Sequence, residues 1–477
     1  MNINEILESI NKKSDFLIKL SDTIWEYAEP PYGEYKSADI IGRALEAEGF
    51  EVKRNIGNIP NAFSGSFGKG KPVIGILGEY DALFGLNQKA GAYNREIYNG
   101  GDCGHGCGHN LLGVGSLAAA IAVKDFLEKS KSEGTVIYFG CPAEEGGAGK
   151  AFMAKEGAFN MLDAAVTWHP DAVTYVFNIS CNANIKAKFK FRGKSAHAAV
   201  HPHLGRSALD AAELLNIGVQ FMREHIIPEA SIHYAFTNSG GTAPNVVQDY
   251  AEVTYMCRAP QIETALENYK WLLDIAKGAA LMTQTRAEAE FQSASSDIIN
   301  NSVLENRMYE NAKKIPFPEY TDEELKFAEK FRKANGCFYD LTEMFPDAGK
   351  EITDFIKEHQ GGAINNFIVP YFSSKRVSKG STDVGDVSRI CPTAAIYVTT
   401  QAANTPGHSW QAVAQGKSSV AHKGMLYAGA VMASVAIDIL SEPRLLADAK
   451  KEHRDKTGGK GYVCPIPDEV KPPFYEA

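Results

Sequence analysis

The chain contains 477 residues, more than the roughly 100–200 of an ordinary domain, so we expect two domains. Hydrophobic residues make up 44% and charged residues 22% of it, which is typical of a globular protein and excludes a disordered one. The formal net charge is −9 and no long basic run occurs, so we expect no nucleic acid partner.

Membrane insertion and export are also not expected. The most apolar late stretch, Tyr427 to Leu440, is about fourteen residues long, short of the ~20 that a membrane helix needs. It therefore predicts a buried core helix. The eight cysteines are thinly spread and no export signal begins the chain, so we expect reduced thiols and a cytoplasmic protein.

Helices and strands alternate through the first 180 residues, which favours an α/β sheet with parallel members. In such sheets functional groups gather at the carboxyl ends of the strands. The apolar periodicity predicts helices at 3–24, 37–48, 111–128 and 149–156, and strands at 51–54, 62–67, 73–78, 135–141 and 164–168.

The pattern changes near residue 180. Ile185 to Arg192 alternates apolar and basic residues, as a strand with one wet face does. The elements expected after it are a helix at 208–224, strands at 232–236 and 251–258, a helix at 262–282 and a strand at 286–292. This β-α-β-β-α-β order is ferredoxin-like. We therefore place an inserted domain at 181–298 and assign 1–180 and 299–477 to the first domain.

The strongest chemical signal is the run Cys103-Gly-His105-Gly-Cys107-Gly-His109-Asn110. Glycines let the backbone fold tightly enough for neighbouring side chains to converge. Thiolate and imidazole are both ligands for zinc and related metals. A glycine-rich loop with incidental thiols is the alternative interpretation.

Two adjacent carboxylates, Glu144 and Glu145, follow the strand at 135–141. They repel each other unless a cation or water compensates them. A metal site can use one as a ligand and leave the other to take a proton from water. His169, expected just past a strand end, and His408 could each be structural, as an exposed glutamate pair could be, but the four features together favour a metal site.

Short motifs along most of the chain carry a resemblance to a known family. They are GEYDAL (Gly78–Leu83), GHGCGHN (Gly104–Asn110), PAEEGGAGK (Pro142–Lys150), TWHP (Thr167–Pro170), GKSAHAA (Gly193–Ala199), GGTAPNVV (Gly240–Val247), Arg258, STDVGDVS (Ser381–Ser388) and AHKGM (Ala421–Met425). On these motifs the chain is identified as a member of the metallopeptidase family that includes aminoacylase, hippurate hydrolase, carboxypeptidase G and the plant auxin-conjugate amidohydrolases. The resemblance implies a zinc-peptidase-like α/β catalytic domain, with a mixed sheet flanked by helices, and an inserted ferredoxin-like α+β lid or dimerisation domain.

The resemblance also implies a site for up to two divalent metal ions, zinc or manganese. The positions that match the family's ligands are Cys107, His109, Glu145, His169 and His408. Glu144 matches the general base, and Asp81 matches a residue that supports a ligand histidine.

Three further positions match residues that contact the substrate in the family. His197 falls on the donor to the developing oxyanion, which in several relatives comes from the partner subunit. Asn245 and Arg258 fall on positions that hold the substrate's carboxylate, a task that suits the planar fork of arginine.

Some positions depart from the family pattern. Asn110 stands where the amidohydrolase branch has aspartate, and the next histidine of that pattern is missing, so occupancy by two metals is left open. Glu79 stands where other branches place a metal-binding histidine. Cys103 matches no ligand, and the roles of Glu79 and His422 stay open.

The resemblance implies hydrolysis of the amide bond of an N-acyl amino acid, of the p-aminobenzoyl-glutamate type, by metal-activated water with Glu144 as the base. The alternatives are a dipeptidase or auxin-conjugate hydrolase of the same fold, a non-catalytic ligand-binding relative, and a cysteine hydrolase with Cys107 as nucleophile. We expect a homodimer through the lid, or a hetero-assembly with a related subunit.

Overall fold

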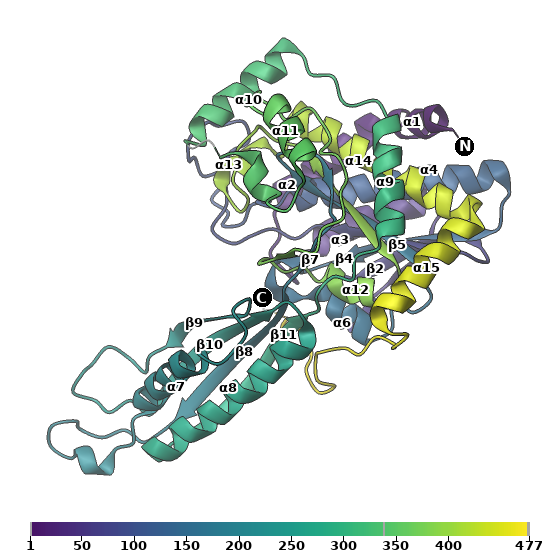
Figure 1. Cartoon of the computed structure of the whole chain (residues 1–477). Helices are drawn as coiled ribbons and strands as arrows, with labels where there is room; N and C mark the ends of the chain where they lie inside the picture. The colour runs from purple at the N-terminus through teal and green to yellow at the C-terminus, as the bar shows by residue number, and fades with distance from the viewer. Residues whose placement is uncertain (1, 337–338, 475–477) are drawn as a thin grey trace.

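The computed structural model describes residues 2–336 and 339–474. A large α/β lobe carries a smaller, elongated lobe that projects from one end of it (Figure 1). The large lobe takes its residues from both ends of the chain, and the small lobe is built from the middle, between Ala183 and Ser295.

The large lobe is organised around a mixed sheet of seven strands. Its central strands β4, β3, β5 and β13 are parallel, whereas β1, β2 and β6 pair antiparallel at the two sides. All seven residues of β3 are buried, as expected for a strand covered on both faces. In spatial order the strands are β1 (Glu51–Arg54), β2 (Phe63–Lys69), β4 (Gly134–Cys141), β3 (Val73–Glu79), β5 (Ala164–Asp171), β13 (Thr393–Thr399) and β6 (Tyr175–Val176). The predicted mixed α/β sheet is confirmed.

Alternating strand residues pack into separate cores on the two faces of the sheet. Ile74 and Ile76 join the core beneath the long helices, and Val73 and Leu77 join the core on the opposite face. The first face carries α1 (Ile3–Asn11), α2 (Ser14–Tyr27), α3 (Tyr35–Ala47), α4 (His109–Ser130), α9 (Ser302–Lys314), α14 (Ser419–Ser441) and α15 (Pro443–Thr457), and the opposite face α6 (Gly149–Lys155) and α12 (Val384–Ile390).

Helices α4 and α14 lie side by side in the centre of this core (Figure 1). Among the described residues, these two helices are long and apolar enough to cross a membrane. However, 94% of the most apolar window of α4 and 83% of that of α14 are buried inside the protein. Both are therefore packed as core helices, and for α14 this confirms the core helix predicted at Tyr427 to Leu440.

One strand is longer than the sequence pattern suggested. We expected His169 just beyond a strand ending at Trp168, but β5 continues to Asp171. Its neighbour β13 extends the pairing, with Tyr397 opposite His169 and Thr399 opposite Asp171. The extra pairing fixes the backbone on which the His169 side chain is presented.

The small lobe is a four-stranded antiparallel sheet covered by two helices. Its strand order, β11-β8-β10-β9, is the one that the β-α-β-β-α-β pattern predicts. One face of β8 is buried and the other is wetter, as its apolar and basic alternation suggested. The elements are β8 (Ala183–Arg192), α7 (Ala208–Met222), β9 (Ser231–Asn238), β10 (Tyr250–Ala259), α8 (Ile262–Thr283) and β11 (Arg286–Ser295).

The polar segment after the small lobe returns to the large lobe. Buried Phe331 and Ile364 pack against Ala402 and Ala414 there, and Phe345 packs against Val173. The segment and its surroundings contain α10 (Asp322–Ala334), a short 3-10 helix (Leu341–Met344), α11 (Lys350–His359), α13 (Trp410–Gln415) and the paired strands β7 (Ser180–Cys181) and β12 (Val377–Ser378).

The cysteines are mostly buried thiols. Each of the seven in the described residues is free, and Cys337 lies outside them. Burial raises the pKa of Cys181 to about 12, so this thiol is held in its unreactive protonated form.

Candidate metal centre

Five ligand-type side chains from distant parts of the sequence converge beside the central strands. The ligand atoms of Cys107, His109 and His169 lie within 4.8 Å of one another. The ligand atoms of Cys107, Glu145 and His408 form a second group, and they too lie within 4.8 Å of one another. The structure thus brings together all five residues that the sequence pattern predicted as ligands, with the Cys107 sulfur common to both groups.

A glycine lets Cys107 and His109 approach each other. Gly108 has a φ of 70°, in the left-handed region, and is the N-cap of α4. A Cβ at this position would lie 3.0 Å from the Pro170 side chain. The positive φ would therefore strain any other residue, and its Cβ would press against Pro170 on β5.

The two adjacent glutamates lie on a short helical turn, α5 (Glu144–Gly147), that follows β4. Both flanking residues are left-handed, Ala143 with a φ of 58° and Ala148 with a φ of 56°. Such conformations are costly for residues other than glycine, and they persist where surrounding contacts impose them. Here the backbone N–H of Ala143 donates to Glu34, at 2.8 Å.

Asp81 holds two of the ligand segments together. One carboxylate oxygen lies 2.8 Å from Nδ1 of His109, and the other accepts the backbone N–H of Glu145 at 2.9 Å. This arrangement leaves Nε2 of His109 facing the cluster. Asp81 therefore occupies the supporting place that the sequence pattern indicated.

Unsatisfied polar atoms line the cluster and make it suitable for a cation. Nε2 of His109 and Oε1 of Glu145 are buried and form no hydrogen bond within the described part of the chain, although Nε2 lies 3.3 Å from a Glu79 oxygen. Nε2 of His408 lies 3.5 Å from the second Glu145 oxygen. Buried polar groups are normally paired, so a set of convergent orphans with sulfur, nitrogen and carboxylate donors fits a divalent metal.

The protonation of these groups is strongly shaped by burial. Burial raises the pKa of Glu144 well above its usual range, and the nearby carboxylates of Glu79 and Glu145 raise it further. Burial also lowers the pKa of His169 to about 4, which keeps its imidazole neutral and able to bind a metal. For His109, burial alone would lower the pKa, but Asp81 outweighs it and raises the pKa.

A buried ion triad lies directly behind the cluster. Nζ of Lys150 is 2.6 Å from a Glu79 oxygen and 2.6 Å from an Asp383 oxygen, and the lysine is fully buried. The second Glu79 oxygen lies 3.3 Å from Nε2 of His109. Glu79, whose role was open, thus has a defined partner. Lys150 and Asp383 were not predicted as site residues, although both stand in the matched motifs.

Other residues of the Cys/His run face away from the cluster. Nε2 of His105 lies 3.1 Å from the Ile24 carbonyl oxygen, and Asn110 donates to Ser21 and to the Gly416 carbonyl. These contacts attach the start of α4 to α2 and to the loop before α14.

Two of the open positions also have clear surroundings. Cys103 is buried, and burial raises the pKa of its thiol to about 11. His422 on α14 pairs with Asp22 on α2, at 2.8 Å. This pair joins the two helices, and neither residue belongs to the donor groups around Cys107.

Arg258 lies where the small lobe meets the large one. Its guanidinium donates to Oγ of Ser381 at 2.8 Å and reaches the Lys379 carbonyl oxygen at 3.5 Å. It pairs in register with Asn184, at the start of β8. The side chain thus faces the segment that carries Asp383.

His197 and Asn245 are not brought to the metal cluster by this chain. Both lie beyond Arg192, at the outer end of β8, which is roughly 27 Å along the strand from Asn184. The two loops that carry them pair there, the Ala198 N–H donating to the Asn245 carbonyl oxygen at 2.9 Å. Both side chains are exposed.

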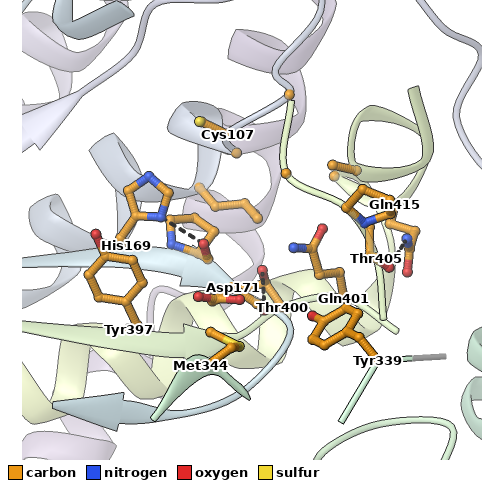
Figure 2. Close-up of a pocket in the computed structure, with 18 residues that line it drawn as sticks. Cys107, His169, Asp171, Tyr339, Met344, Tyr397, Thr400, Gln401, Thr405 and Gln415 are labelled. Atoms are coloured by element: carbon orange, nitrogen blue, oxygen red, sulfur yellow. Dashed lines mark hydrogen bonds between the residues drawn. The ribbon is translucent and has the colours of Figure 1, made fainter. Parts of the chain in front are cut away.

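A cavity of about 360 Å³ opens beside Cys107 and His169. Figure 2 shows Cys107 at its top and Asp171, Met344 and Tyr397 around its lower part. A pocket of this size next to a metal cluster is typical of a small-molecule site.

Comparison with known proteins shows the family to which the chain belongs. The profile of Peptidase family M20/M25/M40 matches residues 75–334, more than half of the chain. The chain is also 47% identical, over 456 residues and 95% of each chain, to one of the subunits of p-aminobenzoyl-glutamate hydrolase from Escherichia coli (strain K12). The chain belongs to this peptidase family. This M20 family member is thus a metallohydrolase of amide bonds, as the sequence motifs implied.

More distant relatives agree on the fold. The M20 chain is 27% identical to the Xaa-Arg dipeptidase of Mus musculus, over 94% of this chain and 91% of that one. A crystal structure of a dinuclear metal binding peptidase of the M20 family from Bacillus subtilis superposes with a TM-score of 0.56 at 18% identity, covering 90% of this chain and 99% of that one. At this identity the likeness shows the shared fold.

Proposed function

We propose that this M20 enzyme hydrolyses the amide bond between an aromatic acyl group and glutamate, as in p-aminobenzoyl-glutamate. The observation that carries the proposal is the convergence of five ligand-type side chains around Cys107, with the protonatable Glu144 beside His109. The substrate class is supported by the 47% identity to a relative that bears this activity in its name.

We assign the cations, zinc or manganese, to the two groups of donors that share Cys107. His109 and His169 would hold one, and Glu145 and His408 the other. Cys107 and imidazole donors suit zinc, and the carboxylate suits either metal. When bound, the cations lower the pKa of a water molecule and neutralise charge that develops on the amide oxygen.

Glu144 is assigned the proton transfers. Its half-buried carboxyl has a raised pKa, so it can take a proton from the attacking water and then deliver it to the leaving nitrogen. Asp81 keeps Nε2 of His109 directed toward the cluster through its hydrogen bond to Nδ1. Lys150 offsets the charges of Glu79 and Asp383, which would otherwise add to that of Glu144.

The substrate's glutamate carboxylate is assigned to Arg258 and Asn245, and the oxyanion donor to His197. Because His197 and Asn245 lie at the outer end of the small lobe, we propose that a second copy of the chain supplies them. The small lobe offers a surface for such a copy, since β9 is an edge strand and apolar side chains near it are exposed. These side chains are Ile217, Phe221, Tyr234 and Phe236. A related but different chain, as the name of the bacterial relative indicates for that enzyme, is the alternative partner.

The test is hydrolysis of p-aminobenzoyl-glutamate by the chelator-treated protein, with zinc or manganese added back. Activity should depend on the metal, and Glu144→Gln should lower kcat by about 10²–10⁴-fold while metal content is unchanged. The matched control is Glu133→Gln, at an exposed position remote from the cluster, which should behave as wild type. Full activity in Glu144→Gln, or full activity without metal, would refute the assignment.

A further inference from the structure

The cavity beside the metal cluster has an aromatic wall. The ring of Tyr397 stacks on His169, with centroids 5.0 Å apart and an interplanar angle of 23°. On its other side Tyr397 stacks on Tyr175 and Phe177, at 4.9 Å and 5.0 Å, and these two rings line the neighbouring cavity and not this one. Met344 lines the same cavity. Stacked rings and a thioether provide a surface suited to a flat aromatic group.

A carboxyl group lies at the far part of this cavity. Asp171 follows His169 by two residues on β5, so both side chains point to the same face of the sheet. Figure 2 places Asp171 beneath the hollow, on the side away from Cys107. Along the strand the two residues are separated by roughly 6.6 Å. In a para-substituted benzoyl group the amine lies at the end of the ring opposite the carbonyl, so a carbonyl near the metal ligands directs the amine toward the far part of the cavity.

The Asp171 carboxyl has unused capacity to accept hydrogen bonds. It accepts the backbone N–H of Ala172 at 2.5 Å and the Tyr175 hydroxyl at 3.3 Å. Within residues 2–336 and 339–474 it forms no ion pair. A carboxylate offers about four acceptor positions, so about two are left for a donor inside the cavity. A carboxyl group facing a partly apolar cavity is stabilised when a ligand supplies that donor.

We propose that Asp171 determines acyl-group specificity by accepting a hydrogen bond from an amino group at the para position of the substrate's aromatic ring. The inference rests on the proposed function and adds the contact that distinguishes an aminobenzoyl group from other acyl groups. The ring lies against the edge of Tyr397, whose faces are already stacked, and its amine N–H donates to the carboxylate. A ring without the amine leaves the carboxylate unpaired, and a nitro group places oxygen against oxygen.

The experiment compares three substrates of similar size: p-aminobenzoyl-glutamate, benzoyl-glutamate and p-nitrobenzoyl-glutamate. Metal-loaded wild type, Asp171→Asn and Asp171→Ser are assayed for kcat/KM, and the metal content of each is measured. Serine and asparagine both keep an oxygen that can accept the Ala172 N–H. Two variants are used so that the comparison can still be made if one of them fails to fold. Asp347→Asn is the control, because Asp347 lines the neighbouring cavity and not this one.

Wild type should prefer the amino substrate over the benzoyl one by at least about tenfold, as expected for a hydrogen bond to a charged group. Asp171→Ser should remove this preference, and Asp171→Asn should improve the nitro substrate relative to the amino one. Asp347→Asn should leave every ratio unchanged. A merely structural Asp171 would lower all three rates together and preserve the ratios, which would overturn the proposal.

Two further outcomes distinguish a failure of the Asp171 contact from a failure of the proposed function. If metal-loaded wild type hydrolyses none of the three substrates, the proposed function fails and the Asp171 contact fails with it. If wild type hydrolyses all three at equal rates, the function stands and the contact is wrong. Glycyl-glutamate is assayed beside the three aromatic substrates. If Asp171→Ser loses hydrolysis of glycyl-glutamate and keeps the aromatic ratios, the carboxylate binds an aliphatic ammonium group and the proposal is overturned.

Discussion

Replacing Lys150 with methionine should reveal how much the buried triad contributes to stability. Methionine has a similar length and no charge, so the change leaves Glu79 and Asp383 without their shared cation. Both carboxylates are at most 3% exposed, and both lie 2.6 Å from the lysine nitrogen. Breaking a buried ion pair by removing one partner costs about 3–5 kcal/mol.

The structure places Lys150→Met near the lower end of that range. Asp383 keeps the backbone N–H of residue 150, which donates to its other oxygen at 2.8 Å. Glu79 keeps His109, at 3.3 Å. We therefore expect the free energy of unfolding to fall by about 3 kcal/mol.

The assay is urea unfolding of chelator-treated protein followed by tryptophan fluorescence. Of the four tryptophans only Trp271 lies in the small lobe, so the signal reports mainly on the large one. The control is Lys12→Met, which removes an ion pair of similar length, 2.8 Å to Glu8, whose side chains are 69% and 64% exposed. An exposed pair contributes less than about 1 kcal/mol.

A second substitution tests the cause of the loss. Glu79→Gln in the Lys150→Met background removes one of the uncompensated charges and should recover about 1 kcal/mol or more. The triad does not act as a buried ion pair if Lys150→Met loses no more stability than Lys12→Met. The same conclusion follows if Glu79→Gln lowers the free energy of unfolding as much in the Lys150→Met background as it does in the wild type.

Three other substitutions test separate parts of the structure. Asp81→Asn should weaken metal affinity by about 10–100-fold in a calorimetric titration, because Asp81 contacts both His109 and the Glu145 backbone; unchanged affinity would contradict its supporting role. Arg258→Ala should raise KM for p-aminobenzoyl-glutamate and leave KM for its carboxyl-blocked ester unchanged, and an equal rise for both would exclude carboxylate binding. Burial alone would raise the pKa of Glu324, but Lys423 at 2.7 Å helps to lower it to about 2. Glu324→Gln should therefore destabilise the protein by roughly 1 kcal/mol at pH 7, a loss that shrinks as the pH falls from about 4.5 to about 2. Thermal unfolding across this pH range checks it against Glu323→Gln, and a difference that does not change with pH would refute it.

The elements that the sequence predicted best are those in which local pattern and tertiary environment agree. The Ala-rich stretch that became α4 and the alternating stretch that became β8 have unambiguous periodicities, so their bounds were predicted within two residues. β5 was cut short because its last residues, Pro170 and Asp171, have low strand propensity, and the pairing with β13 that extends them is a tertiary effect.

The candidate site was only partly visible in the sequence, for a similar reason. The ligand residues stand out because cysteine, histidine and paired glutamates are informative residue types. Lys150 and Asp383 are 233 positions apart, and nothing local shows that they form a contact. The position of His197 depends on the length and direction of β8, so the motif could indicate its role but not that its own chain holds it far from the metal ligands.

Asp81 has a consequence for the spacing of the two donor groups around Cys107. A single carboxylate contacts both the ring of His109, in one group, and the backbone N–H of Glu145, in the other. The distance between the His109 ring and the Glu145 backbone therefore cannot change without moving Asp81. With one ion in each group, as proposed, a pair of ions that needs a wider or narrower separation must displace both contacts of this one side chain.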